Sequence, residues 1–162
     1  MSREKIVSLE QLPQRLKELR GAGEKIVATN GCFDLLHAGH VRYLRAARAL
    51  GGALIVGING DESVRELKGS GRPINNQDDR AEVVAALESV DLVTIFPEKR
   101  ATKFLERAAP DVYVKGGDYK EDTLDAEERQ VLQKIGAKID IVPFEHGYST
   151  SALLKRLGKS AK

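Results

Sequence analysis

Cysteine is nearly absent from the chain, and tryptophan is absent altogether. The one cysteine, Cys32, has no partner for an internal disulfide, so a reducing compartment is its natural setting. No apolar run approaches the ~20 residues that a helix needs to span a bilayer. The first residues also lack the apolar stretch and cleavage site of a secretory signal. We therefore expect a cytoplasmic protein with no membrane partner.

A large excess of charge of one sign is also missing. The 26 lysines and arginines are interspersed with 24 acidic residues, which gives a formal net charge of +2. This balance argues against a surface for nucleic acid, although it leaves room for a small basic cluster that binds phosphates. With 162 residues, 41% of them hydrophobic, the chain can build a core without a stabilising metal. We expect one domain over residues 1–162, with a frayed tail at 159–162.

Short runs rich in valine and isoleucine alternate with stretches in which apolar residues are spaced by three or four. The runs have the length and composition of buried strands, and the stretches between them are typical of amphipathic helices. This alternation predicts an α/β protein in which helices cover both faces of a doubly wound, five-stranded parallel sheet. The expected strands are Ile26 to Thr29, Ala53 to Ile58, Leu92 to Phe96, Val112 to Val114 and Lys138 to Val142.

Polar clusters follow three of these strands. The first strand runs into residues 30–34 and 37–40, the fourth into 115–118, and the fifth leads to 149–151 at a helix start. Sheets of this kind bind ligands beyond the carboxyl ends of their strands. Because all three clusters fall at the same edge, the sequence predicts a single site there.

Two of the three histidines, His37 and His40, flank Gly39 at the start of a helix. At this spacing the two imidazoles lie on one side of a helical turn, beside backbone N–H groups that favour phosphate. The pattern therefore predicts a polyphosphate cradle. Taken alone, H-x-x-H also fits two histidines that merely flank a helix, or a zinc site in which His146 is a third ligand.

The other two clusters have a similar double interpretation. Lys115-Gly116-Gly117-Asp118 fits either a simple turn or a close approach of backbone to a nucleotide. Ser149-Thr150-Ser151 makes a good helix start, and its hydroxyls and free N–H groups also form a second phosphate site. Cations for the same phosphates are available from Lys68, Arg72 and Arg80.

Cys32 lies five residues before His37, which is compatible with a thiolate nucleophile beside a base. No third group that would orient such a base is identifiable in the sequence. We therefore interpret Cys32 as a small residue in a tight turn.

Together these residues resemble a known family. Gly31-x-Phe33-Asp34-x-x-His37-x-Gly39-His40 is similar to the defining motif of the cytidylyltransferase-like nucleotidyltransferases. The segment 149–151 resembles that family's second motif, and Arg80 lies where a triphosphate-binding arginine is expected. The resemblance covers nearly the whole chain and implies a Rossmann-like nucleotidyltransferase fold.

Within the family, four stretches together resemble the branch that forms ADP-heptose for the lipopolysaccharide core: NGCFDLLHAGH, RPINNQDDR, VKGGDY and GYSTSALL. In many bacteria that activity is fused behind a sugar kinase domain, and this chain resembles the stand-alone form. The resemblance implies that AMP moves from ATP to D-glycero-β-D-manno-heptose 1-phosphate while pyrophosphate leaves. Mg²⁺ is expected to accompany the ATP, with no dedicated carboxylate cage. We also expect a homo-oligomer, in the form of a dimer.

Roles for single residues follow from the same resemblance. His37 and His40 are expected to hold the reacting phosphates, and Lys68 and Arg80 to restrain the triphosphate and the leaving pyrophosphate. The remaining expected contacts to ATP are Asn30, Gly31, Cys32, Phe33, Asp34, Gly39, Lys115, Gly116, Gly117, Asp118, Ser149, Thr150 and Ser151.

One departure from the family bears on the choice of nucleotide. Cytidylyltransferases carry an arginine shortly before their G-I-S-T motif, where this chain has Phe144-Glu145-His146-Gly147-Tyr148. The missing cation weakens the case for cytidine. Two alternatives remain, namely a CTP-dependent cytidylyltransferase that acts on a small phospho-alcohol and a non-catalytic nucleotide-binding regulator.

The longest irregular stretch, Lys68 to Gln77, predicts a mobile loop that closes over bound substrates. It contains two glycines and two cations, a composition suited to a lid. We expect its backbone amides to become more protected from hydrogen exchange when ATP and Mg²⁺ are added. Equal protection with and without the nucleotide would contradict this prediction.

Overall fold

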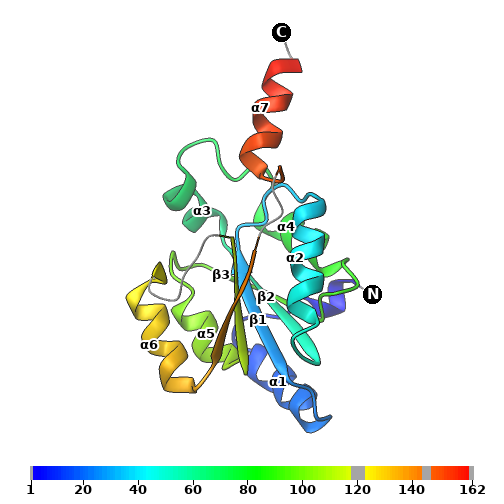
Figure 1. Ribbon diagram of the computed structural model, residues 1–162, viewed down its shortest axis with the longest axis vertical. Helices are drawn as coiled ribbons and strands as arrows, with labels where there is room; N and C mark the ends of the chain where they lie inside the picture. The colour runs from blue at the N-terminus through cyan, green and yellow to red at the C-terminus, as the bar shows by residue number, and fades with distance from the viewer. Residues whose placement is uncertain (1, 118–122, 144–146, 161–162) are drawn as a thin grey trace.

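Five parallel strands form one sheet in the order β3-β2-β1-β4-β5, and helices cover both faces (Figure 1). The computed structural model describes residues 2–117, 123–143 and 147–160. The strands are β1 (Ile26–Gly31), β2 (Ala53–Asn59), β3 (Leu92–Phe96), β4 (Val112–Gly116) and β5 (Lys138–Val142). This arrangement confirms the predicted α/β class, and every predicted strand is present.

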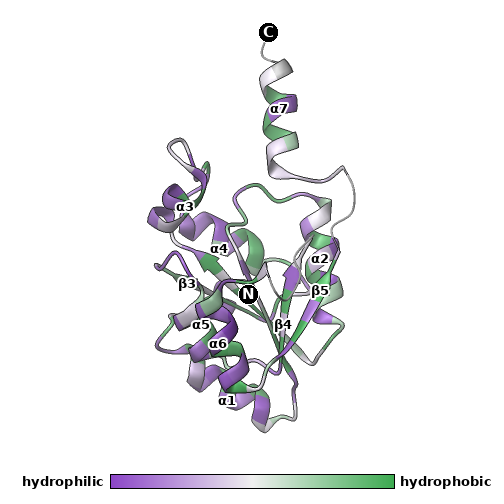
Figure 2. Cartoon of the chain, turned by 60° about the vertical axis from the view of Figure 1, so that its left-hand side comes forward, coloured by the Kyte–Doolittle hydropathy of each residue, from purple (hydrophilic) through white to green (hydrophobic). Residues whose placement is uncertain are grey.

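The two faces of the sheet are packed by different helices. Alternating side chains of β1 divide between them, with Ile26 and Ala28 in one hydrophobic cluster and Val27 in the other. Hydrophobic residues accordingly gather along the strands, whereas the outer surfaces of the helices are more hydrophilic (Figure 2). The first cluster is covered by α1 (Leu12–Gly21), α5 (Thr102–Ala108) and α6 (Ala126–Ile135), and the second by α2 (Ala38–Arg48) and α4 (Gln77–Ala85).

Sequence reasoning missed a helix between β2 and α4. Helix α3 (Asp61–Lys68) buries Val64 completely but leaves Leu67 exposed, so its apolar pattern was too sparse to recognise. The irregular stretch after it is therefore shorter than predicted and covers residues 69–76. A short 3₁₀ helix at Ser2–Lys5 was also missed.

The last helix, α7 (Thr150–Ser160), extends away from the sheet beyond the carboxyl ends of the strands (Figure 1). Its first turn is tied to the rest of the chain, because Thr150 Oγ1 donates a hydrogen bond to the Leu35 carbonyl at 3.3 Å. None of the described helices is both long and apolar enough to cross a membrane.

The order of the strands determines where a ligand can bind. From the central strand β1 the sheet is extended by β2 on one side and by β4 on the other, so the connections after β1 and β4 diverge at their carboxyl ends. Such a switch point leaves a crevice between the diverging connections. The two motifs after β1 and β4 therefore face the same crevice.

Candidate functional site

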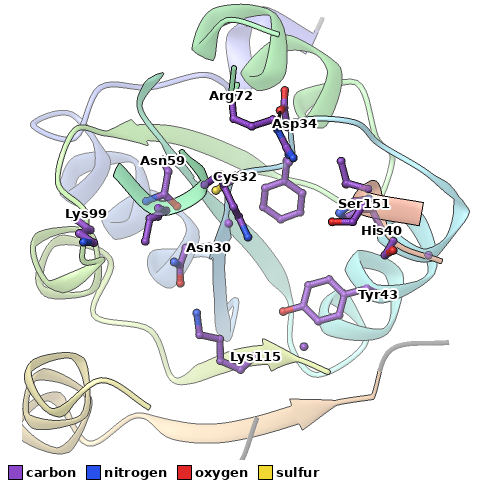
Figure 3. A pocket seen from close by; sticks show the side chains of 18 of the residues that line it. Asn30, Cys32, Asp34, His40, Tyr43, Asn59, Arg72, Lys99, Lys115 and Ser151 are labelled. Atoms are coloured by element: carbon purple, nitrogen blue, oxygen red, sulfur yellow. Dashed lines mark hydrogen bonds and ion pairs between the residues drawn. The ribbon is translucent and has the colours of Figure 1, made fainter. Parts of the chain in front are cut away.

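A cleft of about 580 Å³ lies beyond the carboxyl ends of the strands, a volume typical of small-ligand sites (Figure 3). It brings together the turn after β1, the end of β4 and the start of α7, as the sequence predicted. The predicted site residues that line it are Asn30, Gly31, Cys32, Phe33, Asp34, His37, Gly39, His40, Lys68, Lys115, Gly116, Ser149, Thr150 and Ser151.

Two predicted residues, Arg80 and Gly117, do not line the cleft. Arg80 does not line the cleft, because its side chain is buried beneath the turn. Gly117 lies just past β4, where its N–H donates to the Val142 carbonyl at 3.0 Å. Asp118 lies outside the described residues.

The two histidines lie side by side at the start of α2. Their ring centroids are 3.9 Å apart, and the Phe33 ring lies 5.6 Å from His40. The backbone N–H of His37 donates to Nδ1 of His40 at 3.3 Å. Since Nδ1 accepts a hydrogen bond, the proton of the neutral imidazole is assigned to Nε2, which makes Nε2–H the donor for a ligand.

Burial keeps this pair uncharged. Burial and the neighbouring His37 lower the pKa of His40 to about 4, and burial also lowers the pKa of His37. Charge on either ring would be poorly solvated in this position. At neutral pH the histidines are therefore neutral hydrogen-bonding groups, and the positive end of the α2 dipole lies behind them.

Gly39 allows the two motifs to touch. A Cβ atom at Gly39 would lie 2.8 Å from Cβ of Tyr148 and 2.9 Å from Nδ1 of His37. The Tyr148 ring stacks near His37, with centroids 6.0 Å apart, and Cζ of Arg42 lies 5.2 Å from the centre of that ring. A side chain at residue 39 would push the segment before α7 away from the histidines.

Asp34 uses its carboxylate to hold the loop at 69–76. Its side chain is 1% exposed and accepts hydrogen bonds from Arg72 Nε at 2.7 Å and from the N–H groups of Ile74 and Asn75 at 2.9 Å. Burial favours a raised pKa for Asp34, but these hydrogen bonds outweigh it and the pKa lies below its ordinary value. The second half of the predicted lid is therefore anchored to the motif.

Arg80 holds the turn from below. Its guanidinium donates to the carbonyls of Cys32 at 2.6 Å and Asn75 at 3.0 Å, and it pairs with the Asp61 carboxylate at 2.8 Å. The side chain is completely buried. Sequence reasoning expected Arg80 at the triphosphate, but in the structure these protein groups engage it.

The other groups at the strand ends are also partly buried. Burial raises the pKa of the Cys32 thiol, despite nearby cations, so a thiolate nucleophile is disfavoured. Burial lowers the pKa of Lys115, at the end of β4.

Among the described residues, no three histidine, cysteine or acidic side chains gather as a metal site. His146, the third ligand of the zinc alternative, lies outside the described residues.

Several residues lining the cleft were not predicted. Asn59 ends β2, Lys99 and Arg100 follow β3, and Glu128 comes from α6. Each is a single polar residue with no motif around it, so the sequence alone offers no signal. The position of Asn59, Lys99 and Arg100 after neighbouring strands identifies these three once the strand order is known.

Comparison with known proteins agrees with the family that the sequence motif resembles. A family model described as cytidylyltransferase-like matches residues 28–156. The chain is 46% identical over 157 residues to the bifunctional protein HldE of Wolinella succinogenes, and 47% identical over 152 residues to that of Shewanella amazonensis. These matches cover 96% and 94% of this chain but 32% of each relative, so the chain spans about a third of their length.

Two solved structures are similar in fold. A lipopolysaccharide core biosynthesis protein from Thermoplasma volcanium superposes with a TM-score of 0.63 and 29% identity, covering 76% of this chain and 98% of that one. A pantoate-beta-alanine ligase from Francisella tularensis, in complex with an ATP compound and beta-alanine, gives a TM-score of 0.62 at 16% identity. That match covers 90% of this chain and 68% of the ligase, and it bears on the fold alone.

The depressed pKa of His40 predicts a pH-dependent loss of stability. Between the unfolded pKa of ~6.5 and the folded value of about 4, the unfolded chain binds a proton that the folded chain does not. Stability should therefore fall as pH drops through this window. In His40→Asn, whose side-chain oxygen can replace Nδ1, the slope should be shallower, by at most ~1.4 kcal/mol per pH unit. Denaturant unfolding from pH 7 to 4.5 measures both slopes, and parallel slopes would contradict the assignment.

Proposed function

The chain belongs to the cytidylyltransferase-like family of nucleotidyltransferases, and from that premise we propose that it transfers AMP from ATP to D-glycero-β-D-manno-heptose 1-phosphate. The products would be ADP-heptose and pyrophosphate, for lipopolysaccharide core synthesis. One observation carries the proposal: the two histidines at the start of α2 and the hydroxyls at the start of α7 line the same cleft. Both are sites at which helices favour phosphate.

The reaction needs positioning rather than an enzyme nucleophile. A phosphate oxygen of the sugar attacks the α-phosphorus of ATP, and the bond to the leaving pyrophosphate breaks. Preorganised donors that contact the oxygens where charge builds up lower the barrier to such a transfer. His40 Nε2–H is such a donor, and its orientation is fixed by the bond from His37 N–H. Lys68 and the start of α7 are available to the leaving phosphates.

Arg80 and Asp34 have different roles in this proposal from those expected from sequence. Neither offers a free charge to the nucleotide, because both are engaged by protein groups. We assign them to positioning, since Arg80 supports the Cys32 carbonyl and Asp34 anchors the 69–76 loop. Lysines that line the cleft include Lys68 and Lys115.

Mg²⁺ would be held mainly by the phosphates of ATP and by water. This ion keeps several water ligands and seldom needs a cage of side chains. When bound, the ion would neutralise charge on the triphosphate.

The choice of acceptor rests on the relatives. The similar structure from Thermoplasma volcanium carries the name of a lipopolysaccharide core biosynthesis protein. The HldE relatives are named bifunctional, and this chain matches only about a third of each. These names, with the resemblance of the four sequence stretches to the ADP-heptose branch, support a sugar phosphate as the acceptor.

A pyrophosphate-release assay tests the proposal directly. We expect release with ATP and heptose 1-phosphate, at a kcat/KM well above the value with any of the other three ribonucleoside triphosphates. Mass spectrometry of the product should show ADP-heptose. Comparable kcat/KM for CTP with a small phospho-alcohol would favour a cytidylyltransferase, and nucleotide binding without turnover would favour a regulator.

Substituting the histidines separates a catalytic from a structural role. Removal of one preorganised donor typically costs ~10²–10³ in kcat. His40→Ala should lose that much turnover while its affinity for ATP weakens less, and His37→Ala should have the larger effect on ATP affinity. The same experiment should include His40→Asn, which can accept the His37 N–H and keeps the turn. Near-normal kcat with a lowered Tm in both alanine variants would instead indicate structural histidines.

A further inference from the structure

Resting on the proposed function, we propose that Asn30 and Asn59 recognise a hydroxyl group of the acceptor sugar. The two amides end neighbouring strands, β1 and β2, and both line the cleft. The sequence placed Asn30 among the expected contacts to ATP and assigned Asn59 no role. Hydrogen bonds within the protein orient both amides, and the atoms that they leave for a ligand are complementary.

Asn59 offers an acceptor. The residue is 3% exposed, and its Nδ2 donates to Ser63 Oγ at 3.2 Å. The Ser63 hydroxyl in turn donates to the Gly60 carbonyl at 3.1 Å, so it has no second proton to give to Asn59. The Ser63 oxygen must therefore accept from Nδ2, which leaves Oδ1 of Asn59 as the acceptor for a ligand.

Asn30 offers a donor. The Tyr113 hydroxyl donates to Oδ1 of Asn30 at 2.5 Å. This contact fixes the amide with Nδ2 as the group available to a ligand. Because Tyr113 is completely buried, the orientation is held from inside the protein.

A donor and an acceptor that line one cleft match a hydroxyl group, which accepts one hydrogen bond and donates another. Residues at strand ends are held more rigidly than residues in loops, so the pair is preorganised. A site whose buried polar atoms are positioned to bond a hydroxyl discriminates strongly against a substrate that lacks it, because those atoms then stay unpaired.

The position of the pair favours the acceptor over the nucleoside. Asn59 lies toward Lys99 at one end of the cleft, while His40 and Ser151 lie at the other (Figure 3). The phosphates are expected at the histidines, and the glycines after β4 are expected at the nucleoside. The ends of β1 and β2 are on the other side of the switch point from β4. We therefore assign the Asn59 side of the cleft to the acceptor.

The test combines enzyme variants with substrate variants. Wild-type enzyme and Asn59→Ala are assayed with heptose 1-phosphate and with its monodeoxy analogues, one for each ring hydroxyl. Wild-type kcat/KM should fall about tenfold or more for at least one analogue, which is the loss expected for one hydrogen bond. Asn59→Ala should accept that analogue and the parent sugar within about twofold of each other, while its KM for ATP stays within a few-fold of wild type.

Ser63→Ala is the matched control. It removes the contact that orients Asn59 but changes no residue that lines the cleft. We expect a smaller loss of kcat/KM for the sugar than in Asn59→Ala, and partial loss of discrimination between the parent and the same analogue. Circular dichroism and Tm verify that each variant is folded, and Asn30→Ala should reproduce the loss of discrimination if Asn59→Ala does not fold.

The outcomes separate the two proposals. If the wild type makes ADP-heptose but folded Asn59→Ala still discriminates against every analogue as the wild type does, the hydroxyl assignment is wrong and the proposed function stands. A rise confined to the KM for ATP would place the pair at the ribose and also overturn the assignment. If the wild type adenylates no sugar phosphate, both proposals fall.

Discussion

The buried guanidinium of Arg80 is the contact on which the rest of the site depends. It connects the turn after β1, the 69–76 loop and the start of α3 through the Cys32 carbonyl, the Asn75 carbonyl and the Asp61 carboxylate. A buried charge that loses its partners typically destabilises a protein by ~3–5 kcal/mol. This network therefore commits three segments, far apart in sequence, to one arrangement. The position of the histidines follows, since they come directly after the turn.

The turn needs such support because it is strained. Phe33 has a φ of 47°, in the left-handed region that bulky residues rarely adopt, and such conformations cost ~1–3 kcal/mol. The anchors lie on both sides of it, with Arg80 at the Cys32 carbonyl and the 69–76 loop at the Asp34 carboxylate. The strained backbone places the Phe33 ring beside His40, where it contributes to the burial that keeps His40 neutral.

The amino-acid sequence predicted the sheet and the location of the site better than it predicted the contacts within the site. Runs of valine and isoleucine are buried on both faces of a parallel sheet, so they marked all five strands. Helix α3 has one buried valine and an exposed Leu67, which is too weak a pattern to detect. The sequence analysis expected Arg80 and Asp34 at the ligand, because a motif does not reveal whether a charged residue contacts substrate or protein. Only the fold shows that protein groups already bind both side chains. Arg80 bonds the Cys32 carbonyl, and the Asp34 carboxylate accepts hydrogen bonds from the 69–76 loop.

The same limitation explains why Asn59 escaped notice, and it also shows where specificity can reside in this fold. The groups that we propose bind phosphate belong to helix starts, which are recognisable because they need glycine, serine and histidine at fixed spacing. A strand end needs no such spacing, since its side chain enters the cleft through the register of the sheet. Asn59, at the end of β2, is therefore separate from the anchored turn and from both helix starts. In our proposal the sheet thus separates the phosphate-binding helix starts from the acceptor side of the cleft, because the two are built on different elements.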